Sequence, residues 1–349
     1  MKTRISEDKR NHFLDVLKGI CIFFIVITHF SWSSKERLSY FFPFWIDMAV
    51  PIFMIISGYA YTLSYQKRMI SCAADAYSLK NNIDKLLRYT IPFAIAYCVE
   101  ILYLFYKGSL TVSLDVAFSV FVDFFNGGGG PGSYFFPIMI QFIFVFPPIF
   151  FAIKKHGFKG VLACGVANAF YELLKFSYSM NESCYRLLVF RYILLISVGC
   201  YIANYAGEKQ CHKNIKVFSL FSCALGLTFI VANCYLGYQP KIITYWTRTS
   251  FLASLYIIPI ATILIMKLGA FKFFPLEIIG KASYNIFLVQ MVWYRFVSGK
   301  IETRVTRPVH LAINLIACVG AGLVFYSIES RITKKVIKKC IFYISKFED

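Results

Sequence analysis

Apolar runs separated by short polar segments dominate the pattern of this 349-residue chain. A transmembrane helix needs about 20 consecutive, mostly apolar residues, and ten runs reach roughly this length. They cover residues 12–31, 42–65, 86–106, 134–153, 158–177, 187–206, 217–236, 249–267, 277–297 and 309–330. The pattern predicts an all-α fold, namely a polytopic membrane protein with about ten transmembrane helices in one bundle.

Two segments fit this pattern less well than the others. The run 158–177 is the weakest predicted span, because it contains Glu172 and Lys175. Segment 113–125 is apolar but carries two aspartates, which favours an interfacial or re-entrant segment over a span.

Composition supports the membrane class and charge gives an orientation. The chain is 58% hydrophobic with a mean hydropathy of +0.61, and its net charge is +19. Lysine and arginine concentrate in the loops on the side of the N-terminus, so both termini are predicted to lie in the cytoplasm of a multi-pass cell-membrane protein. Topology and contact with anionic lipid account for the basic excess, and nucleic-acid binding is not needed to explain it.

The chain is predicted to form one transmembrane domain over residues 1–330, followed by a basic cytoplasmic tail over 331–349. The tail is expected to be a helix along the inner leaflet. A charged segment precedes the first run and no small-residue cleavage site follows it, so this run is interpreted as a retained helix. The eleven cysteines are scattered singly without a CxxC pair, and no metal site is predicted.

The first run carries ionisable residues where they are costly, which makes them functional candidates. Eleven residues separate Lys18 from His29, so on a helix they share one face about 16 Å apart. Asp15 falls near the same stripe. The alternatives are a histidine that bonds to a neighbouring helix, a lysine that extends to the membrane surface, and an Asp15–Lys18 pair at i,i+3.

The second run holds Asp47, Ser57 and Tyr59 among apolar residues. A carboxylate at the depth of Asp47 needs a partner. The Ser57-Gly58 pair either contributes to a substrate site or allows close helix packing. In the fourth run, Gln141 either contacts substrate or bridges helices.

Lys85 and Arg88 are i,i+3 neighbours at the start of the third run. Two cations at a helix entrance can bind phosphates, and arginine adds a bidentate fork. The alternative is ordinary anchoring at the cytoplasmic surface. The glycine-rich loop 126–133 is not a phosphate loop, because no lysine and Ser/Thr pair follows it. It is either a flexible substrate entrance or a plain turn.

The ninth run contains a polar group formed by Ser283, Tyr284, Asn285 and Gln290. These side chains either line a cavity or make hydrogen bonds between helices. Arg191, at the outer edge of the sixth run, is expected to be an interfacial anchor.

Four of these segments, in this order, resemble the acyltransferase-3 family, which includes polysaccharide O-acetyltransferases and intercellular-adhesin modification proteins. LDVLKGICIFFIVITH resembles the family's basic residue, ten positions and histidine, with Lys18 in place of the commoner arginine. DMAVPIFMIISGY resembles its second-helix signature, KLLRYTIP its basic-x-x-Arg pair with a proline, and SYNIFLVQ its late segment. Two departures are Gln290, where a histidine is common, and uncharged residues 139–141, where an acidic residue is common. They leave His29 as the candidate imidazole base.

The resemblance implies a ten-helix core, cytoplasmic acyl-CoA as the donor substrate, with acetyl-CoA as the expected form, and a hydroxyl of a surface or exported polysaccharide or glycolipid as acceptor. His29 is then the expected general base, supported by Asp15 or Asp47. The donor's phosphates would be bound by Lys18, Lys85 and Arg88. The candidate substrate contacts are Ser57, Tyr59, Gln141, Tyr284, Asn285 and Gln290.

These assignments predict a polar cavity that joins Lys85 and Arg88 to His29, with walls from the first four runs and the ninth. The acceptor would arrive beneath the 126–133 loop. Two rival functions remain, a glycan exporter and a structural subunit of an envelope polysaccharide synthase complex. An exporter would show inverted repeats and broken helices, whereas the charged residues of this chain cluster in the first three runs.

Overall fold

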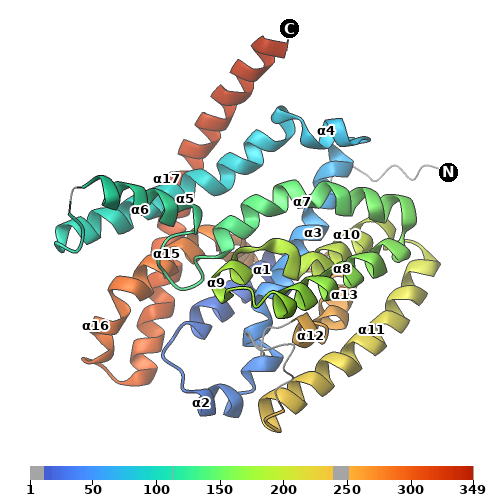
Figure 1. The fold of residues 1–349 in the computed structure, drawn as a ribbon, viewed down its shortest axis with the longest axis horizontal. Helices are drawn as coiled ribbons and strands as arrows, with labels where there is room; N and C mark the ends of the chain where they lie inside the picture. Colours follow the sequence, from blue (N-terminus) through green and yellow to red (C-terminus); the bar gives the residue numbers. More distant parts are fainter. Residues whose placement is uncertain (1–11, 112, 239–250, 349) are drawn as a thin grey trace.

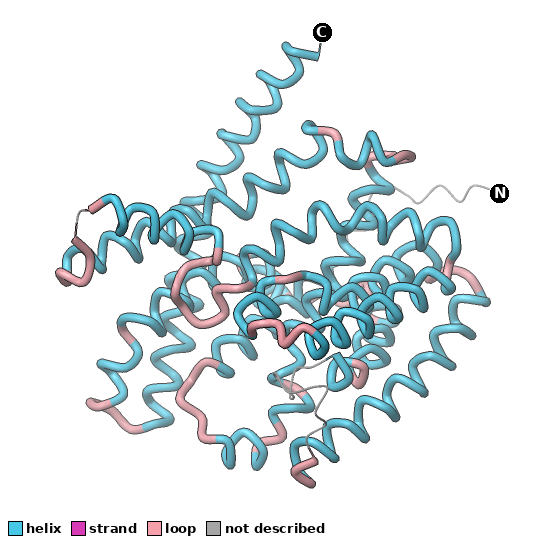
Figure 2. The backbone as a smooth tube through the Cα atoms, viewed as in Figure 1, coloured by secondary structure: helices cyan, strands magenta, loops and turns pink. Residues whose placement is uncertain are grey.

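The computed structural model describes residues 12–111, 113–238 and 251–348. Within these ranges every regular element is a helix, as Figure 2 shows, so the all-α fold is confirmed. The charged segment that precedes the first predicted span, the first two residues of the run 249–267 and the last residue of the predicted tail lie outside the described residues.

Each of the ten predicted runs coincides with helical structure. The longer elements are α1 (His12–Thr28), α3 (Ala49–Lys67), α5 (Leu79–Tyr106), α7 (Phe135–His156), α8 (Phe158–Ser177), α10 (Ile193–Tyr205), α11 (Lys209–Ile230), α13 (Ile257–Lys267), α15 (Ser283–Phe296) and α17 (Arg307–Glu348). The shorter ones are α2 (Ser34–Ser39), η1 (Phe42–Phe44), η2 (Ile46–Met48), α4 (Ala73–Tyr77), α6 (Leu114–Phe125), α9 (Glu182–Leu187), η3 (Val189–Tyr192), η4 (Val231–Tyr235), α12 (Phe251–Ser254), α14 (Phe274–Lys281) and α16 (Ser298–Glu302).

Five segments of the described chain are long and apolar enough to cross a membrane. They are Phe42–Lys67, Ala73–Tyr106, Phe135–His156, Lys209–Tyr235 and Arg307–Ile344. Two further apolar helices are shorter, namely Val189–Tyr205 and Phe251–Lys267. The structure therefore supports a membrane protein, while the number of ten spans stays a prediction: α1 has 17 residues, and α8 contains two ionisable side chains.

Segment 113–125 forms the separate helix α6, which has 12 residues and no buried one. At a rise of 1.5 Å per residue it is about 18 Å long, too short to cross a bilayer. This agrees with the prediction that the segment is not a span.

Close helix contacts fix the centre of the bundle, where α1 and α3 lie (Figure 1). A Cβ on Gly280 of α14 would overlap the backbone oxygen of Asp15, and one on Gly19 would lie 2.5 Å from the backbone oxygen of Leu276. Gly58 of α3 faces the backbone of α10 in the same way. Small residues permit such backbone approach, so the close-packing interpretation of Gly58 is confirmed.

The ionisable residues of α8 are buried in protein. Glu172 is 6% exposed and Lys175 is 7% exposed. The Tyr185 hydroxyl donates a hydrogen bond of 2.6 Å to Glu172 Oε1, and the Lys175 ammonium lies 5.6 Å from the centre of the Tyr185 ring. Arg191 is also buried, so its expected role as an interfacial anchor was wrong.

Helix α17 continues without a break from the last predicted span into the basic tail. Its 42 residues give a length of about 63 Å, and Figure 1 shows its C-terminal part projecting from the bundle. The predicted boundary at residue 330 is therefore not a break in secondary structure.

Candidate active site

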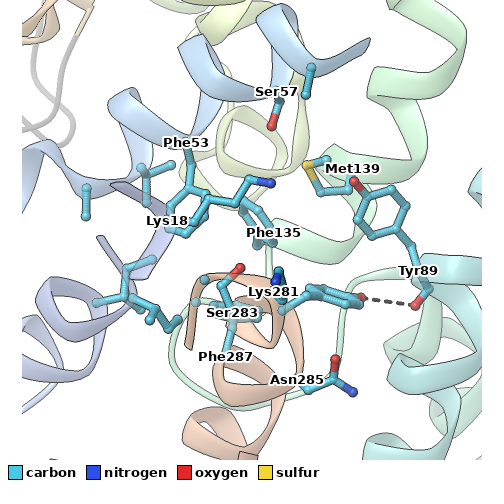
Figure 3. Close-up of a pocket in the computed structure, with 18 of the residues that line it drawn as sticks. Lys18, Phe53, Ser57, Tyr89, Phe135, Met139, Lys281, Ser283, Asn285 and Phe287 are labelled. Carbon is cyan, nitrogen blue, oxygen red and sulfur yellow. Dashed lines mark hydrogen bonds between the residues drawn. The ribbon is translucent and has the colours of Figure 1, made fainter. Parts of the chain in front are cut away.

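One cavity of about 1020 Å³ runs through the bundle. Residues from α1, α3, α5, α7, α14, α15 and α17 line it, and part of the lining is drawn in Figure 3. Lys85, Arg88 and His29 all belong to its walls. The structure thus brings together the residues that the sequence predicted to share a cavity, and it adds α17, which the prediction did not include.

The cavity wall carries six lysine and arginine side chains besides Arg37. They are Lys18, Arg68, Lys85, Arg88, Lys281 and Lys334. In Figure 3, Lys18 and Lys281 extend toward the same central space. Because α14 packs against α1 through Gly280, the close backbone contact is what positions Lys281 beside Lys18.

Carboxylates neutralise only some of these cations. The Lys18 ammonium lies 3.4 Å from Asp15 Oδ1, as the i,i+3 alternative predicted, yet both residues also line the cavity. Asp84 accepts a bond of 2.7 Å from Arg68 Nη2, and Arg88 Nε lies 4.0 Å from the same carboxylate.

Lys85 differs from the other cations because it is only 6% exposed. Its Nζ lies 4.4 Å from the centre of the Tyr65 ring and 5.1 Å from that of Tyr61. Among the described residues this Nζ has no hydrogen-bond partner. Aromatic faces compensate a buried ammonium only in part, so the site favours an anion that enters through the cavity.

His29 lies in the turn directly after α1 and lines the cavity. Its ring centre is 6.4 Å from that of Tyr294, whose hydroxyl donates to the Val26 carbonyl at 2.9 Å. A Cβ on Gly132 would lie 3.5 Å from His29 Nε2 and 2.9 Å from Phe287. Gly132 also has φ +88°, so both space and backbone conformation favour glycine beside the imidazole.

The hydrogen bonds found in the described residues do not include one to the His29 imidazole. Asp15 lies fourteen residues earlier on α1, about 21 Å along the helix axis, and pairs with Lys18. Asp47 forms an ion pair of 2.5 Å with Arg37 Nη2. The prediction that one of these carboxylates supports His29 by direct contact is therefore not met.

Asp47 instead belongs to a network that holds the residue before His29. Arg37 Nη1 donates to the Thr28 carbonyl at 3.0 Å, and Arg37 Nη2 donates to Thr28 Oγ1 at 2.8 Å. Thr28 Oγ1 in turn donates to Asp47 Oδ1 at 3.3 Å. Sequence reasoning missed Arg37. The signal was the buried carboxylate, which required a partner that the sequence alone did not identify.

The segment after His29 is held by the first residue of α17. Arg307 Nη2 donates to the Ser31 carbonyl at 2.6 Å and to Glu36 Oε2 at 3.0 Å. The hydrogen bond from Arg307 is the largest cause that lowers the pKa of the Glu36 carboxyl to about 2. Glu36 therefore stays ionised in mildly acidic solution, and this contact persists there.

The glycine loop 126–133 is fixed by specific contacts. The backbone N–H of Gly129 donates to Glu100 Oε1 at 3.1 Å, and Glu100 is 3% exposed and paired with Arg295. A Cβ on Gly129 would overlap the Arg295 guanidinium, and one on Gly130 would lie 2.8 Å from Met291. The glycines permit close approach to α15, which neither the flexible-entrance nor the plain-turn interpretation anticipated.

Ser283, Tyr284 and Asn285 line the cavity, and the last two also connect helices. The Tyr284 hydroxyl donates to the Tyr89 carbonyl at 3.1 Å, drawn as the dashed line in Figure 3. Asn285 Nδ2 donates to Glu329 Oε2 at 3.0 Å. The two interpretations of this segment are therefore compatible. Ser57 lines the cavity as well.

Three of the predicted substrate contacts lie outside the cavity wall, namely Tyr59, Gln141 and Gln290. Gln141 Nε2 donates to the Leu187 carbonyl at 2.6 Å, and Gln141 Oε1 accepts from the Val189 N–H at 3.2 Å. It therefore bridges segments, as the alternative predicted. Gln290 is fully buried, and Tyr59 is half-buried against the hydrophobic core.

Within the described residues, no group of three or more His, Cys, Asp or Glu side chains could hold a metal ion. A bundle of apolar helices around a cavity with a cationic wall and a histidine defines an integral membrane protein with an internal ligand site. The family model of the acyltransferase domain matches residues 11–327. The chain thus belongs to the acyltransferase-3 family and is a membrane acyltransferase, which confirms the resemblance seen in the sequence. No curated protein and no solved structure matches it.

Proposed function

We propose that this membrane acyltransferase moves an acyl group, with acetyl as the first to test, from cytoplasmic acyl-CoA to a hydroxyl of a polysaccharide. The acceptor is a surface or exported polysaccharide or its lipid-linked precursor. The observation that carries this proposal is the single cavity whose walls contain both the buried, unpaired ammonium of Lys85 and the His29 imidazole. Family membership supplies the acyl transfer itself.

His29 acts as the general base in this proposal. Its imidazole takes the proton of the acceptor hydroxyl while the hydroxyl oxygen attacks the thioester carbonyl carbon. The carbon–sulfur bond then breaks, and the leaving CoA thiolate takes this proton from the His29 imidazolium, which returns the base to its neutral form. Imidazole suits this role because its neutral form has a ring nitrogen that can accept the hydroxyl proton. The Arg37 network positions the turn that carries His29 by holding the Thr28 carbonyl.

The cations bind the donor's phosphates. Lys85, Arg88 and Lys18 were proposed from the sequence, and the structure adds Arg68, Lys281 and Lys334 to the same wall. Each charge-assisted hydrogen bond contributes about 1.5–3 kcal/mol. Because Lys18 and His29 are about 16 Å apart along α1, the thioester end extends toward His29 while the nucleotide end stays among the cations.

We infer the orientation from the distribution of lysine and arginine, which places both termini in the cytoplasm of a cell membrane. The cationic wall then faces the donor's compartment, and the 126–133 loop lies toward the acceptor. A complex for envelope polysaccharide synthesis is the partner that this assignment suggests.

The test is mass spectrometry of envelope glycans from cells that carry the wild-type protein or His29→Ala. We expect the variant to be inserted and folded but to leave the glycans without the acyl group, because the base is lost and little packing changes. His156→Ala is the control, since His156 is exposed and does not line this cavity. Equal acylation by a well-expressed His29→Ala protein would refute the mechanism and favour a structural subunit.

A further inference from the structure

A second, smaller cavity of about 220 Å³ lies where the glycine loop meets α9. Its walls include Gly128 and Ser133 of the loop together with Ser183 and Arg186 of α9. We call it the Arg186 cavity. Ser183 is exposed, so the cavity has a solvent-facing rim, while Tyr134 at its wall is 8% exposed.

Tyr134 lines both the Arg186 cavity and the large cavity, so the two cavities are adjacent at this residue. The Arg186 guanidinium carbon lies 5.4 Å from the centre of the Tyr134 ring, and that of Arg191 lies 5.0 Å from it. Guanidinium groups over an aromatic face hold the ring in place. A Cβ on Gly132, two residues before Tyr134, would lie 3.5 Å from His29 Nε2. The Arg186 cavity is therefore adjacent to the His29 part of the large cavity.

The charge of the Arg186 cavity favours an anion. Among the described residues that line it, Arg186 is the only one with a formal charge. The hydroxyls of Ser133 and Ser183 share this wall. A guanidinium with nearby hydroxyls suits the bidentate binding of a carboxylate or phosphate. The volume is below the roughly 300 Å³ of a typical small-molecule site, so it suits one group of a larger molecule.

We propose that the Arg186 cavity binds an anionic group of the acceptor, and that the acylated hydroxyl is presented to His29 past Tyr134. This inference rests on the proposed function and narrows its acceptor to an anionic glycan or glycolipid. A carboxylate of a uronic acid and a phosphate of a lipid-linked precursor offer the same oxygen chemistry. The experiment therefore includes one probe for each source.

Purified protein in lipid nanodiscs is supplied with acetyl-CoA and one of three acceptors: methyl glucuronide, glucose 1-phosphate or neutral methyl glucoside. The wild type should have a lower KM for at least one anionic probe than for methyl glucoside. The anionic probe with the lower KM shows whether the acceptor's anionic group is a carboxylate or a phosphate. Arg186→Gln should reduce the preference for that probe over methyl glucoside about tenfold, which corresponds to about 1.4 kcal/mol. Arg186→Lys keeps the charge without the fork and should give an intermediate preference.

The control is Arg304→Gln, because Arg304 is exposed and lines neither cavity. It should keep the wild-type preference. A wild type without preference for either anion, or an Arg186→Gln protein with an unchanged preference, would overturn the inference. Calorimetry of the two anionic probes, measured without donor, tests the anion site separately from the proposed acyl-transfer reaction. Weaker binding to Arg186→Gln without any transfer by the wild type would retain the site and refute the proposed reaction, whereas equal binding would refute the site.

Discussion

Replacing Lys85 by methionine separates the contribution of this residue to folding from its contribution to donor binding. Methionine keeps an unbranched apolar chain against Tyr61 and Tyr65 but removes the ammonium. The protein loses a cation–π contact of about 0.5–2 kcal/mol and is relieved of an unpaired buried charge, so its unfolding temperature should stay the same or rise. A donor phosphate loses a bond of about 1.5–3 kcal/mol, which weakens donor binding about 10- to 150-fold.

Isothermal titration of acetyl-CoA into detergent-solubilised protein measures this affinity directly. Lys80→Met is the matched control, because Lys80 is exposed on the same helix and does not line the cavity. The control should bind acetyl-CoA as tightly as the wild type does. If Lys85→Met also binds it as tightly, the reasoning is wrong and Lys85 does not bind the donor.

The remaining predictions concern the donor wall, the Arg37 network and the helix contact. Arg88→Ala should weaken acetyl-CoA binding in the same titration and weaken it further when combined with Lys85→Ala. Unchanged binding would show that neither residue binds the donor. Arg37→Gln should lower kcat and leave acetyl-CoA affinity unchanged, since it loosens the turn before His29, and Arg37→Lys should restore part of the rate; an unaltered kcat would contradict this role. Gly280→Ala should lower the unfolding temperature by the equivalent of about 1–3 kcal/mol, because the methyl group overlaps the α1 backbone, and an unchanged melting curve would show that the contact is looser.

The helical fold and much of the cavity wall were accessible from the sequence because their signals are local. Apolar runs of spanning length predict helices directly. The eleven-residue spacing of Lys18 and His29 fixes their shared face once a helix is assumed. Lys85 was a candidate because it forms an i,i+3 pair of cations with Arg88 at a helix entrance, where phosphates can bind.

The partners of these residues depend on contacts between distant segments, which a single sequence does not specify. Arg37 is close to Asp47 in sequence but lies in a polar segment where arginine is unremarkable. Glu329 and Thr333 reach the cavity only because α17 crosses beside α15. Gln141 was a sound candidate by polarity, but its amide is used by the backbone at residues 187 and 189.

The buried ionic residues of α8 have a consequence for the biogenesis of the protein. A charged residue costs an isolated transmembrane helix about 2.5–3.5 kcal/mol at its centre and less toward its ends, and α8 carries Glu172 and Lys175 among its last six residues. The Tyr185 hydroxyl that bonds to Glu172 belongs to α9, thirteen residues later in synthesis. If α8 crosses the membrane, as the sequence predicts, its stable release into lipid awaits α9, which supplies this partner, and we expect the two segments to insert together.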